Sequence, residues 1–554
     1  MISRRVFVEA LLVLPATLIL PRSASMSPIS NTTSHQKRWL FIWRDLSDLQ
    51  QVDATIAMFS RAQADGYNGI VFGSNIAPVK ASEFKHAAKQ HGLGLIAMVM
   101  GGVRDPNYVE GFFAQDAHFV VNNSKAQHTP DNPTKVANGD FEDFRDNHFN
   151  GWQFQDSEGQ TTFADHEIKH SGTTSLRMEN VGNNPGQHCR IMQTIHLQPR
   201  RQYKITVWVK TQDLSTGIVP EVKLLTTKGD GGISYESFHC DVSQDWKQYN
   251  LVFNSLENTS ALLYLGTWGG TTGKIWWDDL RVDEIALVNM LRRPGCPVTV
   301  RGDDGTIYTE GADYVHLVDP MLHPWVSFHE PPQLQLATNS RIKEGQSLWI
   351  SYYHSVIVLE DRVNACLSEP RVFEDWSDEV KKVNALCQPD AFFMQHDELR
   401  EMNQCASCRA KNMTAGELLA WNIHKATDII RSIRPDASIW VWSDMFDPYH
   451  NAVEQYYLVR GSLKGSWKGL DKDVGIVNWN GGGLDKDCRF FASLGLKQIL
   501  SGYYDSDTDG TKITAWENSV KHVPGVVGSM YTTWENNYVP MGVWARKAWG
   551  SEKS

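Results

Sequence analysis

Short apolar runs that end in polar residues recur along this chain, and helical patterns lie between them. The clearest run covers residues 391–394 and is followed by His396, Asp397 and Glu398. Continuous apolar runs of this length are typical of strands that are buried on both faces of a parallel sheet. Strands that alternate with helices at short spacing predict an α/β fold. We therefore expect a (β/α)8 TIM-like barrel whose strand tips gather polar groups on one active-site face.

The sequence offers nine candidate strands for the eight places of such a barrel. They cover 38–43, 67–73, 93–100, 348–354, 392–398, 438–444, 474–480, 497–504 and 526–535. Helical patterns fill the gaps, and the clearest helix, over 414–433, begins with a capping box formed by Thr414 and Glu417. One candidate strand therefore lies outside the barrel, or one strand is split into two candidates.

Between 136 and 286 the helical patterns disappear, and apolar residues alternate with polar ones. This alternation predicts the short strands of a β-sandwich. The opening motif at 138–142 and the closing motif at 273–282 resemble those of jelly-roll carbohydrate-binding modules of the family 4, 9 and 22 type. We therefore expect an all-β jelly-roll sandwich that interrupts the barrel. The expected order is a first barrel part at 38–120, the sandwich at 136–286, a connecting segment at 287–344 and a second barrel part at 345–548.

The resemblance to these modules implies a structural calcium ion near the paired ends of the sandwich. Glu142 and Asp279 are the matching oxygen donors, and oxygen ligands suit this hard cation. The alternative is that Asp279 only ends a strand. Exposed aromatic side chains bind sugars in such modules, and Trp152, Tyr264 and Trp268 are the candidates here. Each of the three could instead belong to the core.

Asp397 and Glu398 are the strongest candidates for catalysis. Two carboxylates in a partly dry site raise the pKa of one of them, and a raised carboxyl can act as a general acid near neutral pH. The structural alternative is a pair that caps the next helix or binds Arg400. The other candidate substrate-binding residues at strand tips are Arg44, His396, Trp442, Asp444, Trp479, Tyr504, Asp505, Trp534 and Glu535.

An Asp-Glu strand end, an early Arg44 and a late Trp534-Glu535 together resemble glycoside hydrolase family 20, the β-N-acetylhexosaminidases. The resemblance implies an enzyme without a catalytic cofactor, in which Glu398 is the general acid and Asp397 orients the 2-acetamido group of the substrate. It further implies that Arg44, Trp534 and Glu535 bind the sugar and that Tyr504 supports the acetamido oxygen. The chain has Gln395-His396 where the family has two glycines, which puts the acetamido specificity in doubt.

Three alternatives remain open at this point. The first is a retaining glycosidase for another sugar, with Asp444, Asp505 or Glu535 as nucleophile. The second is a non-catalytic polysaccharide-binding protein. The third is a metal-dependent hydrolase that uses His396, Asp397 and the pair Cys405-x-x-Cys408. This pair could be half of a zinc site, a local disulfide or two reduced thiols, and the sequence contains no second CxxC motif to complete a site.

The net charge of the chain limits its possible partners, and its N-terminus predicts its location. A net charge of -11 over 554 residues argues against nucleic acid or an anionic membrane surface as a partner. The 20 tryptophans fit either an oligo- or polysaccharide substrate or a tryptophan-rich core. Arg4-Arg5, an apolar run over 10–20 and small residues at 23–25 resemble a twin-arginine signal peptide. We expect residues 1–25 to direct export to the periplasm or the extracellular space and to leave no stable membrane span after cleavage, although a retained anchor is the alternative.

Overall fold

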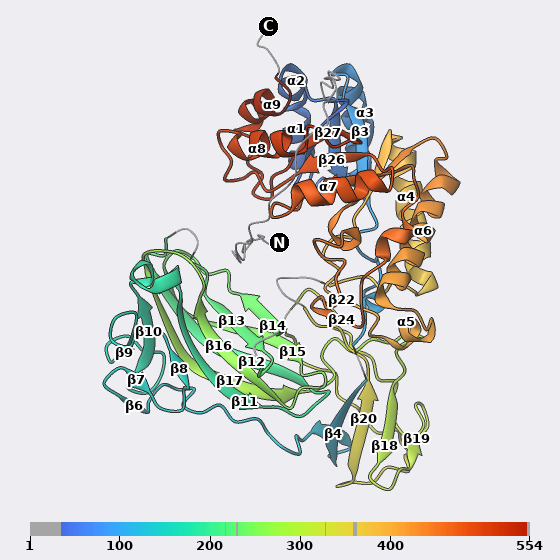
Figure 1. The fold of residues 1–554 in the computed structure, drawn as a ribbon. Helices are drawn as coiled ribbons and strands as arrows, with labels where there is room; N and C mark the ends of the chain where they lie inside the picture. The colour runs from blue at the N-terminus through green and yellow to red at the C-terminus, as the bar shows by residue number, and fades with distance from the viewer. Residues whose placement is uncertain are drawn as a thin grey trace, which may run out of the picture.

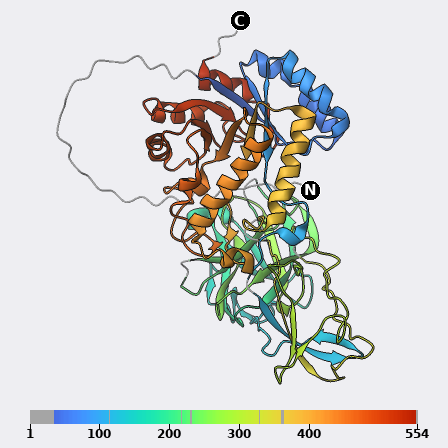
Figure 2. The ribbon, with the colours of Figure 1, turned by 90° about the vertical axis from the view of Figure 1, so that its right-hand side faces the viewer.

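The computed structural model describes residues 35–112, 114–215, 218–228, 231–326, 328–357 and 363–550. These residues form a barrel wrapped by helices, a two-sheet sandwich and a smaller sheet (Figure 1). Figure 2 shows the sandwich and the smaller sheet on the same side of the barrel. The predicted signal peptide lies outside the described residues. None of the described helices is long and apolar enough to cross a membrane.

Eight parallel strands close into a barrel in chain order. They are β1 (Lys37–Phe41), β2 (Gly69–Gly73), β3 (Gly94–Val99), β21 (Ala391–Met394), β23 (Ser438–Trp442), β25 (Val474–Asn478), β26 (Gln498–Ser501) and β27 (Val526–Tyr531). Side chains alternate between the two sides of each strand. In β1, for example, Trp39 and Phe41 lie in the barrel interior, while Leu40 packs against the surrounding helices.

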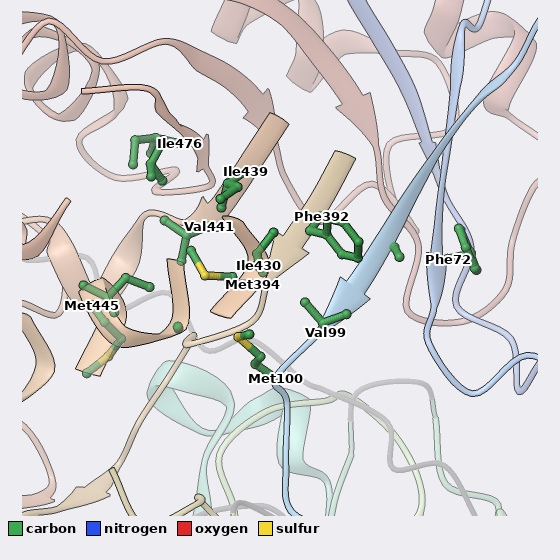
Figure 3. Close-up of a cluster of buried hydrophobic side chains, with 14 of the residues drawn as sticks. Phe72, Val99, Met100, Phe392, Met394, Ile430, Ile439, Val441, Met445 and Ile476 are labelled. Carbon is green, nitrogen blue, oxygen red and sulfur yellow. The ribbon is translucent and has the colours of Figure 1, made fainter. Parts of the chain in front are cut away.

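Helices pack around the outside of this barrel. They are α1 (Leu49–Ile56), α2 (Phe59–Ala64), α3 (Pro78–Gln90), α4 (Pro370–Cys387), α6 (Ala415–Ile433), α7 (Leu484–Ser493), α8 (Thr511–Val520) and α9 (Met541–Trp549). The short helix α5 (Ala406–Ala410) lies farther from the barrel, towards the small sheet (Figure 1). Figure 3 shows part of the layer between strands and helices, where Phe392 and Ile439 meet Ile430 of α6. The predicted capping box is confirmed, because Thr414 Oγ1 accepts a hydrogen bond from the backbone of Glu417 and the Glu417 carboxylate accepts one from the backbone of Thr414.

The sandwich consists of two five-stranded antiparallel sheets. One has the order β15 (Gln244–Asn254), β12 (Gln202–Gln212), β17 (Lys274–Ile285), β10 (Ser175–Glu179) and β9 (Thr162–Asp165). The other has the order β14 (Gly232–Ser237), β13 (Glu221–Leu225), β16 (Ser260–Thr267), β11 (Cys189–His196) and β8 (Phe154–Gln155). A short hairpin, β6 (Phe144–Arg145) and β7 (His148–Phe149), precedes them. The inner faces of the two sheets share one hydrophobic core.

The candidate strand at 348–354 belongs to a third sheet, which confirms the alternative that one of the nine candidates lies outside the barrel. The second barrel part therefore begins with β21 and not at the predicted residue 345. β20 (Ser347–Tyr352) pairs with β4 (Gln115–Asn122) and β18 (Thr299–Gly302), and β5 (Lys125–His128) and β19 (Ile307–Tyr308) complete the sheet. Its buried and half-buried residues alternate, which is typical of a sheet with one solvated face rather than of a barrel strand. The predicted connecting segment at 287–344 therefore supplies two strands of this sheet, and the end of the predicted first barrel part supplies β4.

The sandwich and the small sheet are both inserted between barrel strands β3 and β21. A parallel two-stranded ladder of β22 (Glu401–Met402) and β24 (Leu458–Val459) lies between the barrel and the sandwich (Figure 1). Short 3-10 turns are η1 (Pro106–Tyr108), η2 (Val181–Asn183), η3 (Pro185–Gln187), η4 (Asp444–Phe446) and η5 (Ser466–Gly469). The ends of β21 and β23, which are followed by residues predicted to carry chemistry, therefore lie on the side where the inserted domains join the barrel.

Candidate functional site

The chain takes a strained path directly after β21. His396 and Glu398 both have positive φ angles, of 74° and 48°. Such angles are uncommon for residues other than glycine, and they are found preferentially at functional sites. Asp397 lines a cavity, whereas the Glu398 carboxylate pairs with Arg400. Both acids lie close enough to Asp444 for their charges to act on it. That the two acids share one partly dry catalytic site stays a prediction.

The cavity beside Asp397 has a volume of about 140 Å³ and lies between the ends of β3 and β21. It is lined by Met100, Gly101, Trp325, Val363, Asn364, Ala365, Leu367, Trp376, Gln395, His396, Asp397 and Leu399. A Cβ atom at Gly101 would meet the end of the Gln395 side chain at 2.2 Å, so a larger residue at this point of the wall would displace Gln395. Ordinary ligand pockets measure roughly 300–1,000 Å³, so this cavity accepts a small group rather than a whole oligosaccharide.

His396 is a fixed, neutral part of the cavity wall. Its Nε2 lies 3.0 Å from Oδ1 of Asn422, and its ring packs edge-on against Trp376. Burial lowers the pKa of His396 to about 4, so the ring is uncharged at neutral pH. Nε2 then carries the proton that Asn422 accepts, and Nδ1 is buried away from solvent. His396 is therefore a packed wall residue rather than an open hydrogen-bonding group.

Glu398 belongs to a buried network of charges. Its Oε1 accepts a hydrogen bond of 2.9 Å from Nη2 of Arg400, and its backbone N–H donates to Oδ2 of Asp444 over 2.8 Å. Asn451 Nδ2 also donates to Asp444 Oδ2, and Trp479 Nε1 donates to its Oδ1 at 3.2 Å. Burial and the nearby charges of Asp397 and Glu398 raise the pKa of Asp444 to about 7. Asp444 is fully buried, so it positions Glu398 and Trp479 instead of reaching a ligand.

Four aromatic side chains form a group at the mouth of the barrel. The rings of Trp43 and Trp534 are 4.7 Å apart, Phe41 lies 4.9 Å from Trp534, and Trp442 lies 6.3 Å from it. Trp43 and Trp534 are half-buried, whereas Trp442 is buried in the barrel interior. The structure therefore brings Trp534 and Trp442 together as predicted, but Trp442 serves as the floor of this group rather than as an open surface.

Arg44, Tyr504, Asp505 and Glu535 do not gather around Asp397. Arg44 donates to Thr55 of α1, and its guanidinium lies over the ring of Tyr538. Tyr504 is fully buried in the layer between strands and helices, 5.1 Å from the ring of Trp544, so its predicted contact with an acetamido oxygen is wrong. β26 ends at Ser501, so Tyr504 lies in the loop after the strand, where its ring also packs against Tyr531 and Trp516.

Asp505 and Glu535 instead shape the loop that carries Trp534. Asp505 accepts hydrogen bonds from Thr533 Oγ1 and from the backbone N–H groups of Trp534 and Glu535. The exposed Glu535 accepts one from Tyr503 at 3.3 Å. Asp505 is therefore a positioning residue for Trp534.

The outer face of one sandwich sheet carries a row of side chains that crosses all five strands. Directly paired residues in antiparallel strands point to the same face. The register pairs Phe154 with Met192, Met192 with Tyr264, Tyr264 with Lys223, and Lys223 with Tyr235. All five are exposed or half-buried, while their sequence neighbours in β11, β13 and β16 are buried. We name this set the aromatic row.

Further side chains lie next to the aromatic row, both beside Tyr264 and at the end formed by Tyr235. Trp268 lies 6.2 Å from the ring of Tyr264, and Lys223 Nζ lies 3.7 Å from the Trp268 centroid. At the other end, Tyr235 packs against the cluster of buried residues that includes Leu458 of β24. It also interacts electrostatically with Arg400. The row therefore runs towards the loop that holds Glu398. The pairing that aligns its members cannot be read from single strands, which is why Phe154 and Tyr235 were not predicted.

Trp152, the third predicted aromatic contact, belongs to the core. It is only 2% exposed, and its ring stacks on Phe141 at 5.6 Å. Its indole nitrogen donates to the backbone oxygen of Asn138, so it closes the opening motif of the sandwich from inside. The predicted sugar contact for Trp152 is therefore wrong.

Glu142 and Asp279 lie near each other, and the charge of Asp279 acts on Glu142. The Glu142 carboxylate accepts hydrogen bonds from Thr173 and Thr174, and the Asp279 carboxylate accepts from His170 and Ser171. Asp279 also has a positive φ of 48°. The two carboxylates would suit a hard cation, although protein donors already engage their oxygens. Calcium at this place stays a prediction.

Residues 134–272 match the model of the family described as carbohydrate binding domain, CBM_4_9. The inserted sandwich is therefore similar to a carbohydrate-binding domain, and we refer to it by that name. Among solved structures, a family 16 carbohydrate-binding module is 18% identical and covers 26% of this chain and 97% of its own, with a TM-score of 0.21. A CBM4 module is 16% identical and covers 27% and 100%, with a TM-score of 0.22. The CBM22-1 xylan-binding domain from Paenibacillus barcinonensis is 16% identical and covers 24% and 86%, with a TM-score of 0.18.

No curated protein matches the chain. The resemblance of the barrel to glycoside hydrolase family 20 therefore stays a prediction. The protein thus combines a sandwich that is similar to saccharide-binding domains with a barrel that carries a buried cluster of carboxylates.

Proposed function

We propose that this protein binds a glycan through its carbohydrate-binding domain and hydrolyses glycosidic bonds at the barrel. The observation that supports this most is the cluster of Asp397, Glu398 and Asp444 at the ends of β21 and β23, with the aromatic row ending beside Arg400. Glycoside hydrolysis needs one carboxyl group that donates a proton and one carboxylate that faces the positive charge of the transition state.

The contacts favour particular roles for these carboxylates. The Arg400 guanidinium favours the charged form of Glu398, which does not suit the acid role predicted from the sequence. We assign to Glu398 the negative charge that stabilises the transition state. Burial and the charge of Asp397 raise the pKa of Asp444 to about 7, so Asp444 can hold a proton near neutral pH. Asp397 lines the cavity, and we assign to it the contact through which a proton reaches a bound sugar.

An N-acetylated sugar is the substrate that the resemblance to family 20 suggests, although Gln395 and His396 replace the two glycines of that family. The small cavity fits the acetamido arm better than a whole ring.

A panel of chromogenic glycosides that includes aryl β-N-acetylglucosaminides tests the proposal. Hydrolysis of at least one substrate, with loss of that activity in the Asp397→Asn variant, would support it. Full activity in that variant and in Glu398→Gln would remove both residues from the chemistry.

A non-catalytic glycan-binding protein is the second candidate. The small volume of the cavity and the burial of Glu398 favour this alternative. Retardation of the protein in an affinity gel that contains the glycan, without release of reducing sugar, would decide for the second candidate.

A further inference from the structure

Three cysteines and one glutamate meet in a buried cluster outside the proposed active site. The ligand atoms of Glu110, Cys366, Cys405 and Cys408 all lie within 4.8 Å of one another, and all four residues are buried. The ligands come from three distant segments of the chain. Glu110 follows η1, Cys366 precedes α4, and Cys405 and Cys408 are the N-cap and an inner residue of α5. The partner that the CxxC motif lacked in the sequence is therefore supplied by the fold.

The distances between these atoms are those of a metal tetrahedron. Cys366 Sγ lies 3.6 Å from both Cys405 Sγ and Cys408 Sγ, and Glu110 Oε2 lies 3.4 Å from Cys408 Sγ and 3.8 Å from Cys405 Sγ. Four ligands around a zinc ion with Zn–S bonds of about 2.3 Å have sulfurs about 3.8 Å apart. The cluster already has this spacing, so an ion can bind with little rearrangement.

Neighbouring groups hold the ligands in this arrangement. The backbone N–H groups of Gln404 and Cys405 donate to Oε1 of Glu110 at 2.8 and 2.7 Å, which leaves Oε2 turned to the thiols. Ser368 Oγ donates to Cys408 Sγ at 3.2 Å, and the backbone N–H of Cys408 lies 3.5 Å from Cys405 Sγ. Such outer contacts orient metal ligands and support their charged forms.

A buried cation completes these surroundings. Arg293, whose side chain has no exposed area, pairs with Glu369 at 2.7 Å, and its charge acts on Cys366 and Cys405. Three thiolates and a carboxylate carry more negative charge than one divalent ion neutralises, so a neighbouring guanidinium lowers the free energy of the loaded site.

We propose that Glu110, Cys366, Cys405 and Cys408 bind one zinc ion in a closed, structural site. Sulfur-rich tetrahedral sites select zinc or iron among the common metals, and four protein ligands leave no open position for a substrate. A disulfide is the competing use of these thiols, but all eight cysteines are free in the described part of the chain, and Cys366 is equally close to both partners.

The site would join three segments at the place where the chain leaves and re-enters the barrel. Ala365 and Leu367, on either side of Cys366, line the cavity that contains Asp397. The ion would therefore fix one wall of this cavity without taking part in the chemistry. It would also exclude the predicted metal-dependent hydrolase in which the CxxC works together with His396 and Asp397.

Metal analysis of the purified full chain tests this proposal. We expect about one zinc per chain in the wild type and in Cys488→Ser, which removes a buried cysteine outside the cluster, and far less than one in Cys366→Ser. Equal zinc contents in Cys366→Ser and Cys488→Ser would overturn the proposal. So would an iron–sulfur absorption spectrum, or intact-mass analysis that finds a disulfide among the three cysteines and no metal.

Cobalt substitution covers the case in which Cys366→Ser does not fold. Wild-type protein produced with Co²⁺ should show intense thiolate-to-cobalt absorption together with the d–d bands of a tetrahedral ion. Bound cobalt without thiolate bands, or with an octahedral spectrum, would overturn the assignment of these ligands even if every cysteine variant is insoluble.

Discussion

The backbone N–H of Glu398 donates a 2.8 Å hydrogen bond to Oδ2 of Asp444, which is fully buried at the end of the neighbouring barrel strand. The contact ties the two loops that follow β21 and β23, and it holds Glu398 at its positive φ. The carboxylates of the proposed active site are therefore parts of one cooperative arrangement, and changes in one should be felt in the others.

The pH dependence of stability should report the buried carboxyl of Asp444. Its folded pKa is raised to about 7, mainly by burial and by Asp397, above the ordinary value of 3.8. Such a group stabilises the fold below the unfolded pKa and loses this contribution as the pH rises through the folded pKa. We expect the wild type to lose stability between about pH 4 and pH 7, and Asp444→Asn to lose less over the same range, measured as melting temperature against pH. Parallel curves for the two proteins would place the proton elsewhere.

Removing the cation of the Glu398 pair should destabilise the protein strongly. Arg400→Gln leaves a buried carboxylate without its partner, which costs about 3–5 kcal/mol. The matched control is Arg489→Gln, which breaks an exposed pair with Asp485 on α7 and should cost less than about 0.5 kcal/mol. Urea unfolding at pH 7 measures both free energies. A loss for Arg400→Gln no larger than that of the control would mean that the pair is not buried in solution.

Catalysis should depend on Asp397 and not on Glu535. Asp397→Asn removes the cavity-lining carboxyl, and loss of general acid catalysis should lower kcat by about 10²–10⁴-fold. Glu535→Gln changes an exposed strand-tip carboxylate and should leave kcat within about twofold of the wild type. The substrate is the best aryl glycoside of the panel. Equal losses in the two variants would favour the predicted nucleophile at Glu535 instead.

Glycan binding should depend on the aromatic row and its neighbour Trp268. Trp268→Ala removes an aromatic face next to Tyr264, and we expect about tenfold weaker binding, or ~1.4 kcal/mol. Trp246→Ala removes a half-buried tryptophan of β15, in the opposite sheet, and should not change the affinity. Affinity electrophoresis with a series of polysaccharides measures this difference. Weaker binding by Trp246→Ala alone would move the binding surface to the other sheet.

Calcium should stabilise the carbohydrate-binding domain if Glu142 and Asp279 hold the ion. A ligand that binds only the folded state raises the melting temperature as its concentration rises above its Kd. We expect millimolar Ca²⁺ to raise the melting temperature of the wild type and to have no effect on Glu142→Gln. An identical response of both proteins would show that calcium binds elsewhere, and no response of the wild type would leave the hydrogen bonds from Thr173 and His170 as the whole role of the two carboxylates.

The barrel strands could be predicted because strands buried on both faces carry contiguous apolar residues, as at Phe392 and Phe393. The place of β20 could not, since a strand pattern does not name its partners. The burial of Tyr504 could not either, because β26 ends at Ser501 and the loop that follows has no side-chain periodicity that the sequence would show. The separation of Asp397 from Glu398 depends on two positive φ angles, and the meeting of Cys366 with Cys405 depends on the path of the whole insertion.

The pairing of Gln115 with Tyr352 at the base of the small sheet has a consequence for assembly. Strands β3 and β21 are neighbours in the barrel although the whole carbohydrate-binding domain separates them along the chain. The β4–β20 ladder pairs the two ends of the insertion, so closure of the barrel spans residues 100–114 and 353–390 and not the whole insertion. The small sheet thus shortens the loop that must be ordered when the barrel closes. The length of the sandwich inserted beyond this sheet should therefore have little effect on the rate of barrel closure.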